Sequence, residues 1–381
     1  MNIFNNNKRV SSIYNKSISL LIGKDFAEQL NGKMSGVKDQ GSEQQNRRRE
    51  LLAVEEENNN KKIIEEHGKN HFKTQIKEQF FARVTKQINT ELNNKENLYN
   101  NVLAIEDAAP KILEMLCLKA TSIKRIAPLI SSLPWLSSEV VKLVNKPQFR
   151  KSADVQVKDI NLALSFVGLD NLKLIMPTFI IKHWLPSTTS PFPLLKRKLW
   201  NDSLSIGLAS SVLAEQEGLD TFTAFSAGMF SNIGRLAVTR CSLQTYNELY
   251  RDKLKRAYDN KDKKLHDVLI ELDSSPELLL EQLIVRSDQL TADMIELMQL
   301  DRLQITEPIF DLANAIHFKD MCPIAKVVAK AKAYIAFKSL AKEELISNDE
   351  AKTLLSAVNM TQDSIDLLKK SDITNIKLKF N

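Results

Sequence analysis

Three observations predict an all-α fold for this chain. Gly and Pro number only 10 and 11 in 381 residues, roughly half of average usage, so few residues interrupt helices. Leu, Ala, Lys and Glu, which favour helices, are abundant. Apolar residues recur at three- and four-residue spacing, as at Phe225, Met229 and Ile233, and no segment alternates convincingly with period two.

The first two segments differ in composition from the rest. Residues 1–49 are rich in Asn, Ser and Gly, with a short apolar patch at 18–22, so we expect mostly disordered chain or linker. Residues 50–104 form a charged helical extension, with helices expected at 50–66 and about 70–93. The second helix has an apolar stripe formed by Phe72, Ile76, Phe80, Phe81, Val84 and Ile88. This stripe can dock on the downstream domain or pair with another chain, so an oligomer through residues 50–93 stays open.

Residues 105–315 form the main helical domain, and residues 316–381 continue it and end in a frayed basic tail. Leu133-Pro134-Trp135-Leu136 breaks and restarts a helix, and Gly168 ends another. Further helices are expected at 196–217, 221–238, 242–257, 262–272, 276–286, 290–300, 306–317, 323–342, 347–358 and 361–370.

Charge and cysteine usage exclude several classes of protein. A net charge of +6, from 53 Lys and Arg against 47 Asp and Glu, does not call for a nucleic-acid partner, because no basic block carries interleaved aromatics. Three cysteines far apart in sequence favour reduced thiols in a cytoplasmic protein. The most apolar window, 162–185, contains charged residues, Gly168 and Pro177, so we expect no membrane span.

Classical enzyme motifs are missing. There is no Gly-x-Ser-x-Gly and no phosphate-binding Gly-x-x-x-x-Gly-Lys-Ser/Thr. His67 and His71 have the four-residue spacing of metal ligands, but Gly68 lies between them and no third ligand is near, so we interpret the pair as incidental.

Five runs of residues stand out along the chain. They are Ser122-Ile123-x-x-Ile126-Ala127-x-Leu129-Ile130 with Leu133-Pro134-Trp135-Leu136, Val140-Val141-x-Leu143-Val144-Asn145-x-Pro147-x-Phe149, Val157-x-x-Ile160-x-x-Ala163-Leu164-x-x-x-Gly168-Leu169-Asp170-x-Leu172, Leu199-Trp200-Asn201-Asp202-Ser203-Leu204, and Gly228-Met229-Phe230-Ser231-Asn232-Ile233-Gly234-Arg235-Leu236. In order and spacing, these runs resemble the HDOD domain family, a degenerate branch of the HD metal-dependent phosphohydrolases.

The resemblance implies an HDOD-like array of helices and places the family's metal-binding positions in this chain. The first His position falls on Asp202, the His-Asp pair falls on Ser231 and Asn232, and the last acidic position is assigned to Lys332. A lysine cation repels a metal ion, and serine and asparagine are weak ligands. We therefore expect no catalytic residue, no metal and no cofactor at these degenerate positions.

The polar side chains around these positions have two interpretations. They bond to one another as core structure, which is the favoured interpretation, or they line a vestigial pocket for a small phosphorylated ligand. That pocket would comprise Trp200, Asn201, Asp202, Ser231, Asn232 and Arg235, with Arg235 as the anion contact.

The function implied by the resemblance is non-catalytic: a bacterial regulatory or signal-transduction protein that acts through protein partners. Two alternatives stay open. One is a metal-dependent phosphohydrolase acting on a nucleotide or cyclic dinucleotide, and the other is a nucleic-acid-associated regulator.

Overall fold

The computed structural model describes residues 4, 7–30, 53–147, 149, 156–272 and 274–378, with side chains of the second range described from residue 70. These residues form helices and loops, with no β-strand among them, in agreement with the predicted all-α class. The elements are α1 (Lys8–Ile22), α2 (Lys24–Leu30), α3 (Ala53–Leu92), α4 (Lys95–Asn97), the π-helical turn η3 (Leu98–Val102), α5 (Ala108–Cys117), α6 (Ile123–Ser131), α7 (Pro134–Val144), α8 (Ile160–Val167), α9 (Leu169–Trp184), α10 (Leu195–Gln216), α11 (Thr221–Phe230), α12 (Ile233–Asp259), α13 (Lys263–Ile270), α14 (Pro276–Leu297), α15 (Thr306–Ala313), the 3₁₀ turn η4 (Phe318–Asp320), α16 (Pro323–Lys342), α17 (Asn348–Ser356) and α18 (Gln362–Lys370).

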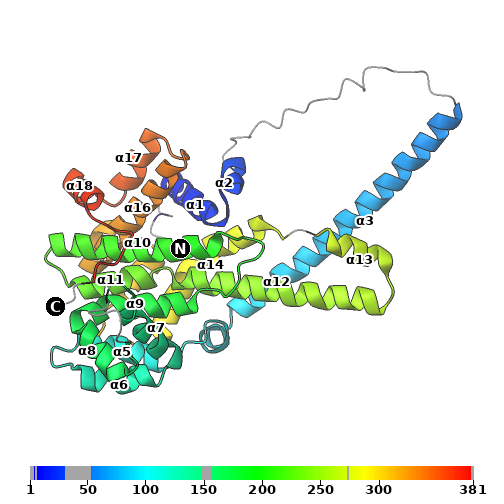
Figure 1. The fold of residues 1–381 in the computed structure, drawn as a ribbon. Coiled ribbons are helices and arrows are strands. Elements are labelled where there is room, and N and C mark those ends of the chain that lie inside the picture. Colours follow the sequence, from blue (N-terminus) through cyan, green and yellow to red (C-terminus); the bar gives the residue numbers. More distant parts are fainter. Residues whose placement is uncertain are drawn as a thin grey trace.

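The centre of the molecule is built on α10, which packs against α11 and α16, and on α12, which packs against α14 (Figure 1). Short helices α5 to α9 gather on one side of this centre and bury Trp184 completely. The core is continuous through both groups, because buried residues of α5 to α9, α10, α12, α14 and α16 belong to one hydrophobic cluster. The helices of residues 316–381 are thus part of the central packing, with α16 against α10 and α11.

Local sequence signals set the ends of several helices. Asp220 accepts a hydrogen bond from the Thr223 backbone amide at the start of α11, which satisfies a donor that the helix leaves free. Pro323 occupies the first turn of α16, where its missing N–H costs nothing. Ser347 and Glu350 form a complete capping box at the start of α17.

The helix break near the expected polar pair lies earlier than predicted. The prediction placed helices at 221–238 and 242–257, but α11 ends at Phe230 and α12 runs unbroken from Ile233 to Asp259. Ser231 caps α11, with its hydroxyl donating to the Gly228 carbonyl at 2.8 Å. The chain therefore turns at Ser231 and Asn232, where the Ser231 side chain competes locally for a backbone carbonyl. Likewise, α3 and α14 are each continuous where two helices were expected.

The described part of residues 1–49 departs from the expected linker. Residues 8–22 and 24–30 are the helices α1 and α2, and α1 packs against α14, α16 and α17. Val10, Ile13 and Ile18 of α1 are buried, each less than 4% exposed. Because of their helical spacing, these residues form one apolar face of α1. The overall composition of the segment did not reveal this face, because most of its residues are polar. Residues 31–49 of the expected linker lie outside the described residues.

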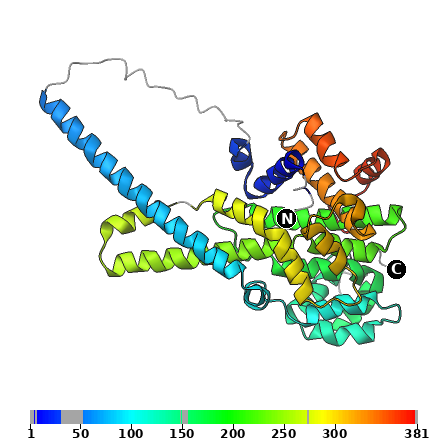
Figure 2. The same ribbon diagram turned by 180° about the vertical axis from the view of Figure 1, so that it is seen from behind.

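The long helix α3 leaves the body as a rod beside α12 and α13 (Figures 1 and 2). Near the body, Phe80, Val84 and Ile88 are fully buried, and the Phe80 ring contacts Tyr246 of α12 with centroids 5.7 Å apart. The second half of the predicted apolar stripe thus docks on its own chain.

None of the described helices is by itself both long and apolar enough to cross a membrane; α8 and α9 reach that level only as a pair bent by 110°.

Candidate functional site

Close helix packing at two glycines brings the polar segments together. Gly228 of α11 approaches α10 so closely that an added Cβ would lie 2.8 Å from the Gly207 Cα. At Gly234 a Cβ would lie 1.9 Å from the Ser287 carbonyl oxygen of α14. Glycine is therefore required at both positions, and the turn at Ser231 and Asn232 is held between α10 and α14.

A buried ion pair occupies the centre of the site. Arg235 Nη1 donates to Asp202 Oδ2 at 2.7 Å, and the two side chains are 6% and 16% exposed. Asn232 Nδ2 donates to the same Asp202 oxygen at 3.0 Å. Arg235 Nη2 donates to the Tyr14 hydroxyl at 2.8 Å, so a side chain of α1 completes the arrangement. Burial raises the Tyr14 pKa to about 12, so this phenol stays neutral.

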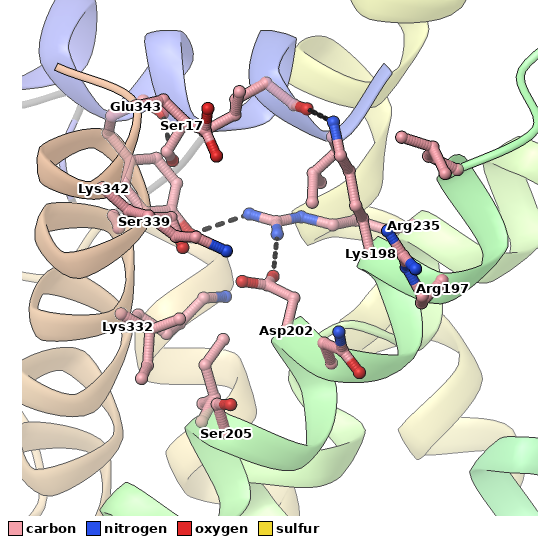
Figure 3. Close-up of a pocket in the computed structure, with 18 of the residues that line it drawn as sticks. Ser17, Arg197, Lys198, Asp202, Ser205, Arg235, Lys332, Ser339, Lys342 and Glu343 are labelled. Carbon is pink, nitrogen blue, oxygen red and sulfur yellow. Dashed lines mark hydrogen bonds and ion pairs between the residues drawn. The ribbon is translucent and has the colours of Figure 1, made fainter. Parts of the chain in front are cut away.

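A second cation, Lys332 of α16, points toward Asp202 (Figure 3). Its ammonium donates to the Ser231 carbonyl at 3.4 Å and lies 3.9 Å from Asp288 Oδ1. Only 3% of the residue is exposed. Burial lowers the Lys332 pKa to about 8, against the opposing attraction of Asp288. Lys332 is thus still mostly charged at neutral pH, although its charge is poorly stabilised.

These groups form the floor of a cavity of about 390 Å³ between α1, α10 and α16. Cavities of roughly 300–1,000 Å³ are typical of small-molecule sites. Six cationic side chains and two carboxylates line it. The walls also include apolar groups, among them Leu20 of α1, Ile206 of α10 and Ile335 of α16.

The structure brings together most of the residues that the sequence singled out. Asn201, Asp202 and Arg235 line the cavity. Asn232 is buried and reaches it only through Asp202. Ser231 is buried, with its carbonyl facing Lys332. Trp200 packs against the hydrophobic core and does not line the cavity.

The residues at the family's metal positions do not fit a metal ion. The Asp202 carboxylate is already paired with Arg235, and the Ser231 hydroxyl donates to the chain itself. Among the described residues, no three His, Cys, Asp or Glu side chains lie close enough to share a metal. A catalytic zinc site needs about three protein ligands, and here two cations lie beside one carboxylate. His71 is exposed, and the side chain of His67 lies outside the described side chains.

Several residues of the cavity could not be predicted as a site. Tyr14, Lys24 and Leu20 come from the segment that we expected to be linker. Arg197 and Lys342 lie on helices that were predicted, but nothing in the sequence relates one to the other. The available signal was the spacing of Val10, Ile13, Tyr14 and Ile18, which is that of an amphipathic helix.

The chain is thus an all-helical domain in which the residues assigned from the sequence to metal positions are hydrogen-bonded to neighbouring protein groups. The HDOD domain family matches residues 103–276. The chain therefore contains an HDOD domain, as the five sequence runs predicted.

Solved structures similar to this chain share low sequence identity with it. A candidate metal-dependent phosphohydrolase from Shewanella amazonensis SB2B is 17% identical, with a TM-score of 0.46, covering 76% of this chain and 95% of that one. A second candidate phosphohydrolase from the same organism is 18% identical, with a TM-score of 0.41 and coverages of 72% and 92%. An HDOD domain protein of unknown function from Geobacter sulfurreducens is 20% identical, with a TM-score of 0.40 and coverages of 71% and 85%. No curated protein sequence matches the chain.

Proposed function

We propose that this protein is a non-catalytic regulator of HDOD type, which acts in signal transduction by binding protein partners and senses a small ligand in its cleft. The observation that carries the proposal is the pair of cations, Arg235 and Lys332, beside Asp202. A divalent metal placed among them would be repelled by both, and the repulsion is strong where water is scarce. Water activation by a metal, on which HD hydrolysis depends, therefore lacks its ligands here.

The location of the protein is part of the proposal. We place it in the cytoplasm, supported by three cysteines that carry free thiols and by burial that raises the pKa of each thiol. Such thiols are poor nucleophiles and suit a reducing compartment. Self-association through residues 50–93 stays a prediction, for which the half-buried Phe72 and Ile76 of α3 are the relevant side chains.

Metal content and hydrolysis test the non-catalytic assignment. The full chain is purified, its metals are quantified, and Mn²⁺ is titrated calorimetrically beside the variant Asp202→Asn. We expect no stoichiometric metal, no Mn²⁺ binding and no cleavage of a chromogenic phosphodiester above the rate of the variant. One equivalent of metal that is lost in Asp202→Asn, together with hydrolysis, would establish the phosphohydrolase alternative instead.

Affinity capture from native cells tests the mode of action. We expect the full chain to retain a protein partner at constant yield before and after nuclease treatment. A partner that disappears on nuclease treatment would point to the nucleic-acid-associated alternative.

A further inference from the structure

The cavity between α1, α10 and α16 has an excess of positive charge. Lys24, Arg197, Lys198, Arg235, Lys332 and Lys342 line it, against Asp202 and Glu343. Three of these cations are paired: Arg235 with Asp202 at 2.7 Å, Lys24 with Glu343 at 3.0 Å, and Lys332 with Asp288, which lies behind the wall, at 3.9 Å. Arg197, Lys198 and Lys342 have no carboxylate partner among the described residues, so the cavity keeps an excess of three positive charges.

The cations that an anion could contact lie at two depths. Lys332 lies in the floor and is 3% exposed, with one hydrogen bond at 3.4 Å and one ion pair at 3.9 Å, although an ammonium has three donors. Arg197 and Lys342 are exposed at the rim and make no hydrogen bond or ion pair with the described residues. They come from opposite walls, α10 and α16 (Figure 3). Lys198, between floor and rim, donates to the Leu20 carbonyl of α1.

This arrangement of charges is unfavourable in itself. The buried Lys332 ammonium is only weakly stabilised by an ion pair as long as 3.9 Å, and like charges on facing walls repel one another. An anion that reached from the rim to the floor would relieve both effects. Arg235 is not the principal contact for such an anion, because Asp202 at 2.7 Å already compensates its charge and Tyr14 accepts from its other terminal nitrogen.

We propose that the cavity binds a small soluble organic diphosphate, with one phosphate group at Lys332 and the other between Arg197 and Lys342. Each phosphate carries about −1.5 to −2 charges at neutral pH, so two of them together offset the excess of positive charge. The apolar wall formed by Leu20, Ile206 and Ile335 contacts the organic part of the ligand. This assignment deepens the proposed function, on which it rests, by naming the ligand class and the residues that recognise it.

Titration of the full chain with inorganic pyrophosphate tests the site. We expect pyrophosphate to bind with one-to-one stoichiometry and at least tenfold more tightly than inorganic phosphate. The variant Arg197→Gln/Lys342→Gln should weaken pyrophosphate binding at least tenfold. Because both side chains are exposed and unpaired, this variant should fold as the wild type does.

The matched control is Lys111→Gln/Lys124→Gln, which removes the same charge from exposed positions on α5 and α6. It should bind pyrophosphate as the wild type does. Absence of pyrophosphate binding, or equal weakening in the control, would overturn the diphosphate site. The proposed function is judged separately, since metal binding and hydrolysis decide it whatever the outcome for pyrophosphate.

Discussion

Arg235 is held by an anionic partner on α10 and by a neutral phenol on α1. Burial opposes its charge, but Tyr14, Asp202 and Asp288 more than compensate and raise its pKa. The Arg235 guanidinium is therefore well stabilised in its charged form. Lys332 of α16 differs, because its ion pair with Asp288 is 3.9 Å long and burial outweighs it, so the pKa of Lys332 falls whereas that of Arg235 rises.

Lys332 should make the stability of the protein depend on pH. It loses its proton at about pH 8 in the folded protein and at 10.5 in the usual exposed state. Between these values the unfolded chain binds more protons, so the free energy of unfolding rises with pH across this window. The full cost of the buried charge is present below pH 8. Across this window, the free energy of unfolding of the wild type should rise by up to about 3 kcal/mol relative to that of the Lys332→Met variant.

Urea unfolding of both proteins from pH 6.5 to 11 measures this difference. The charged groups that act on Lys332 are Asp288 of α14, Arg235 of α12 and Asp202 of α10. They are present in both proteins, so their own titration largely cancels in the comparison. Parallel pH profiles for the two proteins would contradict the assigned role of Lys332.

Sequence reasoning identified Asp202, Asn232, Arg235 and Lys332 from a family pattern, and the structure brings these side chains together. It could not identify Tyr14, because a contact across 221 positions leaves no trace in local spacing. The sequence also suggested Arg235 as an anion contact, but it did not reveal that the guanidinium is hydrogen-bonded to Asp202 and Tyr14. Pairing of side chains is a property of tertiary packing, which composition and periodicity do not encode.

At the scale of the elements, the two glycine contacts determine where α11 and α12 can lie. Helical periodicity correctly predicted helices around 225–243, but it placed the break about eight residues too late. The break lies at Ser231 and Asn232. On either side of it, Gly228 and Gly234 bring α11 and α12 into close contact with the backbones of α10 and α14. A single sequence shows the glycines but not the neighbours that require them.

Gly234→Ala should destabilise the protein strongly. The new methyl group would meet the Ser287 carbonyl and the Thr291 amide, both backbone groups that cannot rotate away. Overpacking of this kind costs about 3 kcal/mol. Thermal or urea unfolding measures the loss.

Gly23→Ala serves as the control for this substitution. The residue lies between α1 and α2, and its added Cβ would be at an ordinary 3.7 Å from the Phe26 Cβ. The Gly23→Ala variant should have a free energy of unfolding close to that of the wild type. A Gly234→Ala protein as stable as Gly23→Ala would show that α12 and α14 can separate without cost.

At the scale of the whole molecule, the N-terminal helix is a structural part of the body, although the HDOD match begins only at residue 103. Its Lys16 forms an ion pair with Glu350 of α17 at 2.6 Å. The all-α class, the helical extension and the C-terminal helices followed from composition and periodicity. The docking of α1 did not, because it depends on surfaces more than 300 residues away in sequence.

Ile13→Ala should therefore behave as a core substitution. Ile13 is 1% exposed, and truncation of a buried isoleucine to alanine costs about 2–5 kcal/mol. Leu30→Ala in α2 is the matched control, since Leu30 is 53% exposed and should change the free energy of unfolding by less than about 0.5 kcal/mol. If a urea titration showed that neither substitution changes the free energy of unfolding, this segment would be a linker, as the composition suggested.

The docking of α1 on α16 also bears on how the protein matures during translation. Residues 8–22 leave the ribosome long before Lys342, where one wall of their docking site ends. At about 5–20 residues per second, α1 waits tens of seconds for α16. Throughout that interval its apolar face is available to chaperones or to another nascent chain. The cleft consequently forms only after α16 has been synthesised.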